Sequence, residues 1–107
     1  MVRHCVLFKM SASSSAPEID ECLRGLAAVA GALPGLLDFV GGRDVFPETR
    51  NRGYTHGFVM TFDTAGHRDA YLTHPDHVAL ATRVWKLVDG GKDGTLIVNF
   101  DELHVGV

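Results

Sequence analysis

Polar and apolar residues alternate in four segments of the chain with a period of two residues. This period is typical of β-strands, whose successive side chains point to opposite faces of a sheet. The pattern predicts strands over residues 2–10, 36–46, 53–62 and 95–104. One face of the first strand carries Val2, His4, Val6, Phe8 and Met10, and one face of the third carries Tyr54, His56, Phe58, Met60 and Phe62. Gly41 and Gly42 are expected to weaken or bulge the second strand.

Apolar residues between the first two strands recur every three or four positions, which is typical of an amphipathic helix. Ser15 is expected to cap the N-terminus of this helix, with Glu18 reaching back to form a capping box. Pro34 and Gly35 are expected to end it. The apolar positions with helical spacing are Ile19, Cys22, Leu23, Leu26, Ala30 and Leu33.

A second helical region follows the third strand. Asp63 or Thr64 can cap a short helix that runs to Leu72. Pro75 suits the first turn of a further helix, because the amide hydrogen that proline lacks would have no partner there. This region is therefore expected in two pieces. One side of the second piece carries His77, Ala81, Val84, Trp85 and Val88.

The order strand–helix–strand–strand–helix–strand predicts an α+β fold, in which an antiparallel four-stranded sheet carries its helices on one face. The length of 107 residues corresponds to a single domain, expected over residues 1–107. The first, third and fourth strands carry apolar residues on both faces, but the helices can cover only one of them. A second copy of the chain is the simplest cover for the other face, so a homodimer is expected.

Charge and composition bear on the partners and the location of the protein. The net charge is -3 and the basic residues are dispersed among acidic ones, so nothing indicates a nucleic-acid partner. No apolar run approaches the roughly 20 residues that span a bilayer. The first residues have the pattern of a strand rather than of a signal peptide, so a cytoplasmic location is expected. Cys5 and Cys22 lack CxxC spacing and are expected as free thiols in small buried positions.

Three segments resemble one known family when they are taken together. They are Arg-His-Cys-Val-Leu-Phe-Lys at 3–9, Gly-Tyr-Thr-His-Gly-Phe-Val-Met-Thr-Phe at 53–62 and Tyr-Leu-Thr-His-Pro-Asp-His-Val at 71–78. In this order and spacing they are similar to the stress-responsive A/B barrel (Dabb) family. The resemblance implies a dimeric α/β barrel in which two ferredoxin-like sheets pack together. The family includes stress-induced plant proteins, bacterial proteins of unknown role and plant polyketide cyclases.

The resemblance to the polyketide cyclases also implies roles for individual residues. It implies that His77 is a general base with Tyr71 as its partner, and that His4 and His56 line the same cavity. The cyclases place bulky aromatic residues on the first helix, where this chain has Cys22, Leu23 and Leu26, so a different substrate is expected. The residues expected to bind substrate are His4, His56, Leu23, Leu26 and Trp85.

The residue types suit this chemistry independently of the resemblance. Aldol cyclisation needs a base that removes a proton beside a carbonyl group and a donor that stabilises the enolate oxygen. His77 lies in the first helical turn, where the helix dipole disfavours an imidazolium, so a neutral imidazole that can accept a proton is expected. Tyr71 can supply the donor. The alternative for both residues is a structural role in the core.

His4 and His56 interrupt strand faces that are otherwise filled by Phe, Met and Val. A buried imidazole without a hydrogen bond costs about 1–3 kcal/mol, so two of them indicate a polar floor in an apolar cavity. The alternative is a pair of buried histidines satisfied by the backbone or by water.

No metal and no cofactor is expected. The six histidines form no HxH, HExxH or His–Cys cluster with ligand spacing, and there is no P-loop and no GxGxxG motif. Three functions are therefore open. The first is a homodimeric enzyme that acts on a small apolar carbonyl compound. The second is a non-catalytic stress-response or structural dimer, and the third is a cofactor-free monooxygenase-like enzyme, because a fold alone does not determine an activity.

Overall fold

The fold follows the predicted order, with the second helical region divided in two. The computed structural model describes residues 1–46 and 49–101. Its elements are β1 (Val2–Phe8), α1 (Ala16–Gly31), β2 (Leu36–Arg43), β3 (His56–Phe62), α2 (Ala65–Thr73), α3 (Pro75–Trp85) and β4 (Thr95–Asp101), with 3₁₀ turns at Thr49–Asn51 and Gly91–Gly94. The α+β ferredoxin-like prediction is confirmed.

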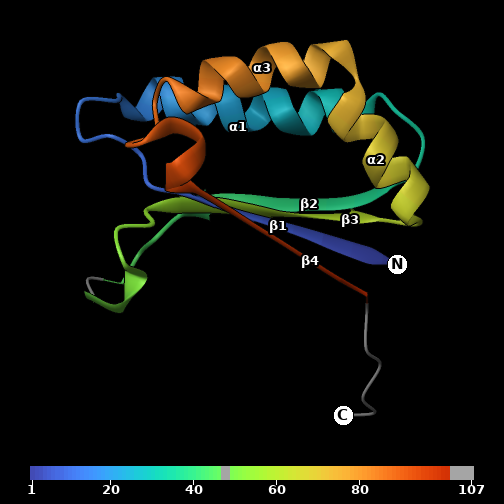
Figure 1. Cartoon of the computed structure of the whole chain (residues 1–107), viewed down its shortest axis with the longest axis horizontal. Helices are drawn as coiled ribbons and strands as arrows, with labels where there is room; N and C mark the ends of the chain where they lie inside the picture. The colour runs from blue at the N-terminus through green and yellow to red at the C-terminus, as the bar shows by residue number, and fades with distance from the viewer. Residues whose placement is uncertain (47–48, 102–107) are drawn as a thin grey trace.

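The four strands form one antiparallel sheet in the order β2-β3-β1-β4. Helices α1 and α3 lie side by side over one face of this sheet, and α2 lies at one end (Figure 1). No α-helix of the described residues lies over the opposite face, called the open face below. In the register of the sheet, His4 on β1 pairs with Met60 on β3 and with Asn99 on β4. This register places Asn99 on the same face of the sheet as His4.

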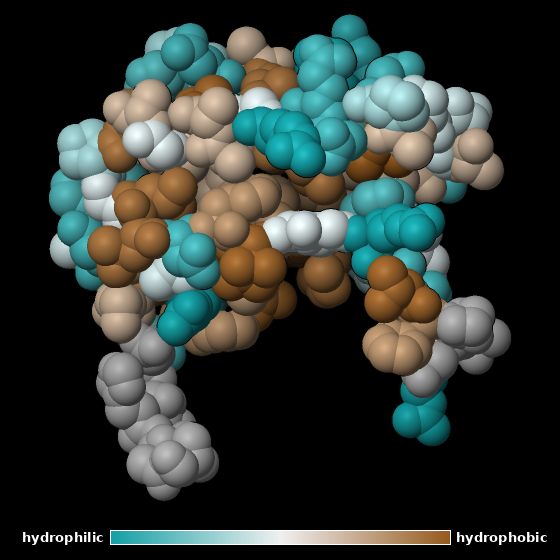
Figure 2. All heavy atoms as spheres, turned by 180° about the vertical axis from the view of Figure 1, so that it is seen from behind, coloured by the Kyte–Doolittle hydropathy of each residue, from teal (hydrophilic) through white to brown (hydrophobic). Residues whose placement is uncertain are grey.

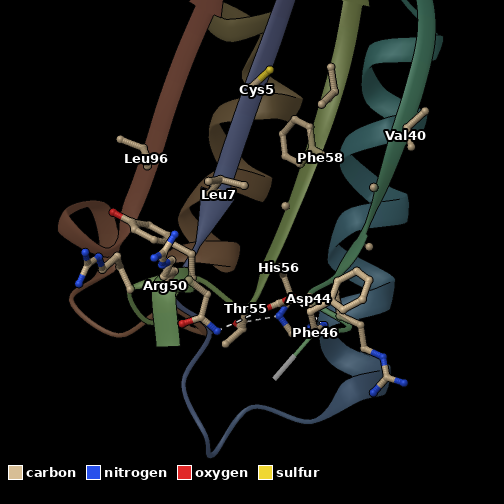
Figure 3. A pocket seen from close by; sticks show the side chains of 18 residues that line it. Cys5, Leu7, Val40, Asp44, Phe46, Arg50, Thr55, His56, Phe58 and Leu96 are labelled. Carbon is tan, nitrogen blue, oxygen red and sulfur yellow. Dashed lines mark hydrogen bonds between the residues drawn. The ribbon is translucent and has the colours of Figure 1, made fainter. Parts of the chain in front are cut away.

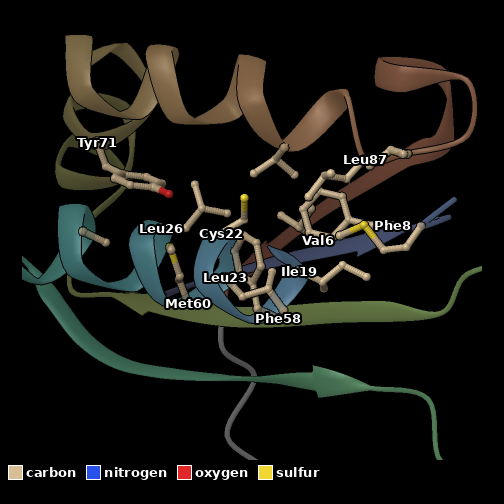
Figure 4. Close-up of a cluster of buried hydrophobic side chains, with 14 of the residues drawn as sticks. Val6, Phe8, Ile19, Cys22, Leu23, Leu26, Phe58, Met60, Tyr71 and Leu87 are labelled. Carbon is tan, nitrogen blue, oxygen red and sulfur yellow. The ribbon is translucent and has the colours of Figure 1, made fainter. Parts of the chain in front are cut away.

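The core fills the space between the sheet and the helices (Figure 4). Alternate residues of β1 and β3 face this core, so the faces predicted from the period-two pattern are confirmed for their central positions. All six apolar positions predicted for the first helix contribute to the core or pack against it, although α1 ends at Gly31 and Leu33 follows it. Buried residues of the core include Val6, Phe8, Ile19, Cys22, Leu23, Leu26, Phe58, Met60, Tyr71 and Val84. The covered face is therefore packed by the chain's own helices.

Side-chain caps fix where the helices begin. The Ser15 hydroxyl accepts a hydrogen bond from the Glu18 amide at 3.2 Å, which confirms Ser15 as the N-cap of α1. Thr64, rather than Asp63, caps α2 by accepting from the His67 amide at 3.1 Å. His74 Nδ1 accepts from the Asp76 amide at 3.1 Å and caps α3. The last cap starts α3 directly at Pro75 and so places His77 in its first turn.

Several strand boundaries differ from the prediction. The irregularity in β2 lies between Leu36 and Asp38 and not at the two glycines. Gly41 and Gly42 stay in register with β3, and a Cβ on Gly41 would lie 3.0 Å from Phe58 Cβ. The glycine at 41 therefore permits close approach of the two strands rather than a bulge.

Three other ends are also shorter than predicted. β1 ends at Phe8, and Met10 forms only an isolated bridge with Val88. β3 begins at residue 56, and Gly53, where the predicted strand began, has a φ angle of +88° that an extended strand cannot adopt. β2 ends at Arg43. Residues 102–104 of the predicted last strand lie outside the described residues.

Candidate functional site

A small cavity lies between α3 and the covered face of the sheet. Its volume is about 70 Å³. It is lined by His4, Val6, Phe8, Leu26, Phe58, Leu72, His77, Ala81, Val84, Trp85, Thr95 and Ile97. The walls are mainly apolar, and the two histidines introduce ring nitrogens. Four of the predicted site residues, His4, His77, Leu26 and Trp85, therefore line one cavity.

The turn before α3 fixes the tautomer of the neutral His77 ring. His77 Nδ1 lies 2.9 Å from the backbone oxygen of Leu72. A carbonyl oxygen can only accept, so Nδ1 carries the hydrogen and the neutral ring keeps an unprotonated Nε2. Burial lowers the pKa of His77 below its ordinary value, and the bond to the carbonyl opposes this in part. The result is a half-buried imidazole with a free lone pair.

Tyr71 lies directly against His77. The centroids of the two rings are 4.5 Å apart at an interplanar angle of 57°, and the ring of Phe62 packs 5.7 Å from Tyr71. Tyr71 is fully buried, and no atom of the described residues makes a hydrogen bond with its hydroxyl group. Burial raises the pKa of this hydroxyl far above its ordinary value, so it stays protonated. Tyr71 is thus an unpartnered donor next to the cavity, although it is not one of the residues that line it.

His4 is buried on the floor of the cavity and is held by β4. Its Nδ1 lies 2.7 Å from Asn99 Oδ1, and the Arg68 Nε group donates to the same oxygen at 3.0 Å. Burial is the largest cause of a lowered pKa for His4. The bond to Asn99 raises it, and the charges of Arg68 and His77 lower it. His4 is therefore expected to be neutral near pH 7.

His56 does not line the cavity that His4 and His77 share. It pairs with Phe8, four residues along β1 from His4, which corresponds to roughly 13 Å along a strand. His56 instead borders a hollow of about 800 Å³ at one end of the open face, together with Arg43, Asp44 and Tyr54 (Figure 3). Its Nδ1 lies 2.8 Å from the Thr55 hydroxyl. Burial, followed by the charge of Arg43, lowers its pKa.

Leu23 also lies apart from the cavity. It is a buried member of the core on α1, and it is not among the residues that line the cavity. Leu26, one helical turn later, does line it. The helix rotation of about 100° per residue therefore separates two positions that the sequence pattern placed on the same apolar face.

Two residues of the site were missed by the sequence analysis, namely Asn99 and Arg68. The pattern of β4 contains a signal for the first. Thr95, Ile97, Asn99 and Asp101 share the covered side of the strand, so a polar amide there can meet the buried His4. Nothing in the local pattern around Arg68 indicates its partner, because the contact depends on how α2 lies against the sheet.

The open face of the sheet is strongly apolar. Exposed apolar side chains lie along the sheet, and the surface is hollowed there (Figure 2). These side chains are between 41% and 62% exposed and belong to Leu7, Val40, Leu96, Val98 and Phe100. Cys5 also lies on this face and is only partly buried, so the prediction of a buried position holds for Cys22 and is wrong for Cys5. The difference arises because alternate residues of β1 face away from the helices.

The described residues offer no metal centre and no membrane span. Within 1–46 and 49–101, no group of three His, Cys, Asp or Glu side chains is placed so that it could hold a metal ion. No helix in that part of the chain is long and apolar enough to cross a bilayer.

A four-stranded ferredoxin-like sheet with helices on one face and a histidine-lined cavity defines a class of small α+β proteins. Residues 2–101 match the family model described as the Stress responsive A/B Barrel Domain, so the chain belongs to this family. The resemblance predicted from three sequence segments is confirmed.

Individual proteins of known sequence or structure are similar to most of this chain. The Arabidopsis thaliana stress-response A/B barrel domain-containing protein HS1 is 29% identical over 106 residues, which cover 99% of this chain and 94% of that protein. Olivetolic acid cyclase of Cannabis sativa is 26% identical over 77 residues, covering 72% of this chain and 76% of the cyclase. A solved dimeric ferredoxin-like protein of unknown function from Jannaschia sp. CCS1 has a TM-score of 0.84 at 29% identity and covers 94% of this chain and 98% of its own.

Proposed function

We propose that the protein is a homodimeric enzyme that binds a small apolar carbonyl compound beside α3 and acts on it by acid–base chemistry of the cyclase type. One observation carries this proposal. The neutral His77 ring donates through Nδ1 to the Leu72 carbonyl, which leaves the Nε2 lone pair as a base in an apolar cavity. The similarity to a plant cyclase supports the same class of reaction.

The proposed reaction begins with proton removal beside the carbonyl group. His77 Nε2 takes the proton, the carbon–hydrogen bond breaks, and its electron pair forms the enolate. The Tyr71 hydroxyl, which lacks a partner among the described residues, is the donor available to stabilise the enolate oxygen. The enolate carbon then attacks a second carbonyl group of the same molecule, and the imidazolium returns the proton to the new alkoxide. No oxidant or reductant is needed.

The size of the cavity limits what can enter. An apolar cavity of about 150 Å³ can bind benzene, and this cavity is about half that volume. The reacting end of a substrate therefore fits inside, whereas a larger apolar part would extend past Trp85 and Ile97. Ile97 is 50% exposed, so this side of the cavity is at the surface.

The dimer is proposed from the open face. Its apolar side chains belong to strands that are covered by helices on the other side only. Contiguous exposed apolar surface on a sheet favours association with a partner. The similar structure from Jannaschia sp. CCS1 is described as dimeric, which supports a second copy of this chain as that partner.

The test of the base is hydrogen–deuterium exchange at the carbon beside the carbonyl of butanone, followed by proton NMR in D₂O. The wild-type dimer is expected to accelerate this exchange. His77→Ala should lower the rate by about 10²–10⁴-fold, which is the usual contribution of a positioned general base. The rate should rise with pH and level off above the pKa of His77, which burial lowers from 6.5.

His67→Ala is the matched control, because His67 is a histidine of α2 that lies outside the cavity and is 41% exposed. This variant should exchange butanone at the wild-type rate. If the wild type gives no exchange above buffer, or if both histidine variants behave alike, His77 is not the base and the enzymatic proposal is wrong.

The small volume of the cavity favours a second candidate, a non-catalytic stress-response dimer in which the histidines are core residues. In that case His77 would show no NMR shift with butanone or with larger ketones and phenols. A wild-type dimer without exchange activity and with an unperturbed His77 would favour this candidate.

A further inference from the structure

A chain of hydrogen bonds runs from α2 through β4 to the cavity floor. Arg68 donates to Asn99 Oδ1 at 3.0 Å, and the same oxygen lies 2.7 Å from His4 Nδ1. We propose that Arg68 and Asn99 are positioning residues that fix the tautomer of His4, with the hydrogen on Nδ1 and the lone pair on Nε2. Neither residue lines the cavity, so both act through His4.

The first step concerns the side-chain amide of Asn99. An amide can present its oxygen or its nitrogen to a neighbour, but a guanidinium group can only donate. Arg68 therefore selects the orientation in which Oδ1 faces it. A second contact holds Arg68 itself, because its Nη1 donates to the Asp69 carboxylate at 2.6 Å. The orientation of the amide is thus set by a residue outside the sheet.

The second step concerns the imidazole. Once Oδ1 of Asn99 faces His4, this oxygen can only accept, so Nδ1 of His4 must carry a hydrogen. His4 is 2% exposed, so its ring is almost entirely removed from bulk solvent. The direct pairing of positions 4 and 99 in the β1–β4 ladder keeps both side chains on the same face. The tautomer is therefore a consequence of strand register and of the position of α2.

Burial is the largest cause that favours the neutral form of His4, and a nearby positive charge adds to it. Arg68 approaches from α2, and its positive charge disfavours a further charge on His4; His77, on α3, has the same effect only when it is protonated. On β4 the partner is the neutral Asn99. A carboxylate at that position would instead favour the imidazolium. Burial and the charge of Arg68 therefore keep His4 neutral against the opposing effect of the bond to Asn99, and the role of Asn99 is to fix which ring nitrogen carries the hydrogen.

This arrangement has a consequence for the ligand, and that consequence rests on the proposed function. His4 and His77 both have Nδ1 occupied, by Asn99 and by the Leu72 carbonyl, so both keep an unprotonated Nε2. Two acceptors in one cavity, one on the sheet and one on α3, favour a ligand that brings hydrogens of its own. The structure thus points to hydroxyl-bearing carbonyl compounds, or their enols, over carbonyl compounds that can only accept.

The test is the nitrogen chemical shifts of His4 in the ¹⁵N-labelled protein, recorded without ligand at a pH where the ring is neutral. The wild type should show a protonated Nδ1 and an unprotonated Nε2. Asn99→Leu should lose this single tautomer. Asn99→Asp should restore it and raise the pKa of His4, because a carboxylate accepts from Nδ1 more strongly. Arg68→Met should give a mixture of both tautomers.

Arg24→Met is the matched control, because Arg24 pairs with Asp20 on the exposed side of α1. It should leave the nitrogen shifts of His4 unchanged. A wild-type ring with the hydrogen on Nε2, or an unchanged tautomer in Asn99→Leu, would overturn the inference. Because the measurement uses no ligand, it can succeed when butanone exchange fails, and the two proposals are tested separately.

Discussion

The hydroxyl group of Tyr71 lowers the stability of the fold, and removing this one oxygen atom tests that effect. It is buried, and the described part of the chain provides it with no hydrogen-bond partner. A buried polar group in this state costs about 1–3 kcal/mol relative to a paired one. Packing against Phe62 and His77 explains why an aromatic ring occupies position 71, but it does not explain why the ring carries a hydroxyl group. A role of the Tyr71 hydroxyl in ligand binding therefore explains its presence better than a contribution to the stability of the fold.

Tyr71→Phe tests this interpretation. Removing the hydroxyl should leave the free energy of unfolding unchanged or raise it by about 1 kcal/mol, because an unpaired buried group is lost and the ring is kept. Urea unfolding at a fixed protein concentration measures the change. Tyr54→Phe is the control, since Tyr54 is only partly buried and its substitution should change stability by less than about 0.5 kcal/mol. A loss above about 1 kcal/mol in Tyr71→Phe would show that the hydroxyl has a structural partner.

At the residue scale, the sequence predicts His4 and His77 as site residues but does not predict their hydrogen-bond partners. The polar residues at 4 and 77 stand out because they interrupt apolar faces with a clear period. The atoms that fix the tautomers of these two histidines, the Leu72 carbonyl oxygen and Asn99 Oδ1, carry no such signal. A backbone oxygen is present at every position, and only the fold determines which one faces a ring. The separation of His56 from His4 likewise depends on register along the strands.

At the scale of elements, the junction between α1 and β2 shows how one residue sets the placement of two helices. Gly35 has a φ angle of +104°, and its carbonyl accepts from the Asp63 amide at 2.9 Å. A Cβ at this position would collide with the His67 side chain on α2. The sequence predicted Pro34 and Gly35 as the helix stop, but α1 ends at Gly31, and Gly35 instead turns the chain into β2. The contact with α2 could not be predicted, because it joins segments that are distant in sequence.

Gly35→Ala should therefore destabilise the protein by more than about 1 kcal/mol, since both the backbone conformation and the available space exclude a methyl group. Gly31→Ala provides the matched control. A Cβ at Gly31, the last residue of α1, would meet nothing within 4 Å, so this variant should be neutral or more stable by about 0.5–1 kcal/mol. Thermal unfolding of the two variants measures the difference. Equal stability of both would contradict a close contact between Gly35 and α2.

At the scale of the whole molecule, the two faces of the sheet differ in what covers them. The helices bury one face, and the strand pattern predicted which residues lie there because the period of two divides them without ambiguity. The same pattern left apolar residues on the open face, from which a second copy was inferred. The fold could thus be predicted from the sequence in order and class. The ends of strands could not, because they depend on backbone angles at residues such as Gly53.

A charge placed on the open face tests the dimer. Leu7 lies on the inner strand β1 and is 41% exposed, so Leu7→Glu leaves the core intact but introduces a carboxylate where the second copy would pack. An uncompensated buried charge costs about 3–5 kcal/mol, which weakens association by at least roughly 100-fold. Light scattering after size exclusion should give twice the chain mass for the wild type and the single chain mass for this variant. Val78→Glu, at a 52% exposed apolar position on α3, should remain dimeric. A dimeric Leu7→Glu protein would place the interface elsewhere, whereas a monomeric wild type would rule out the homodimer at that concentration.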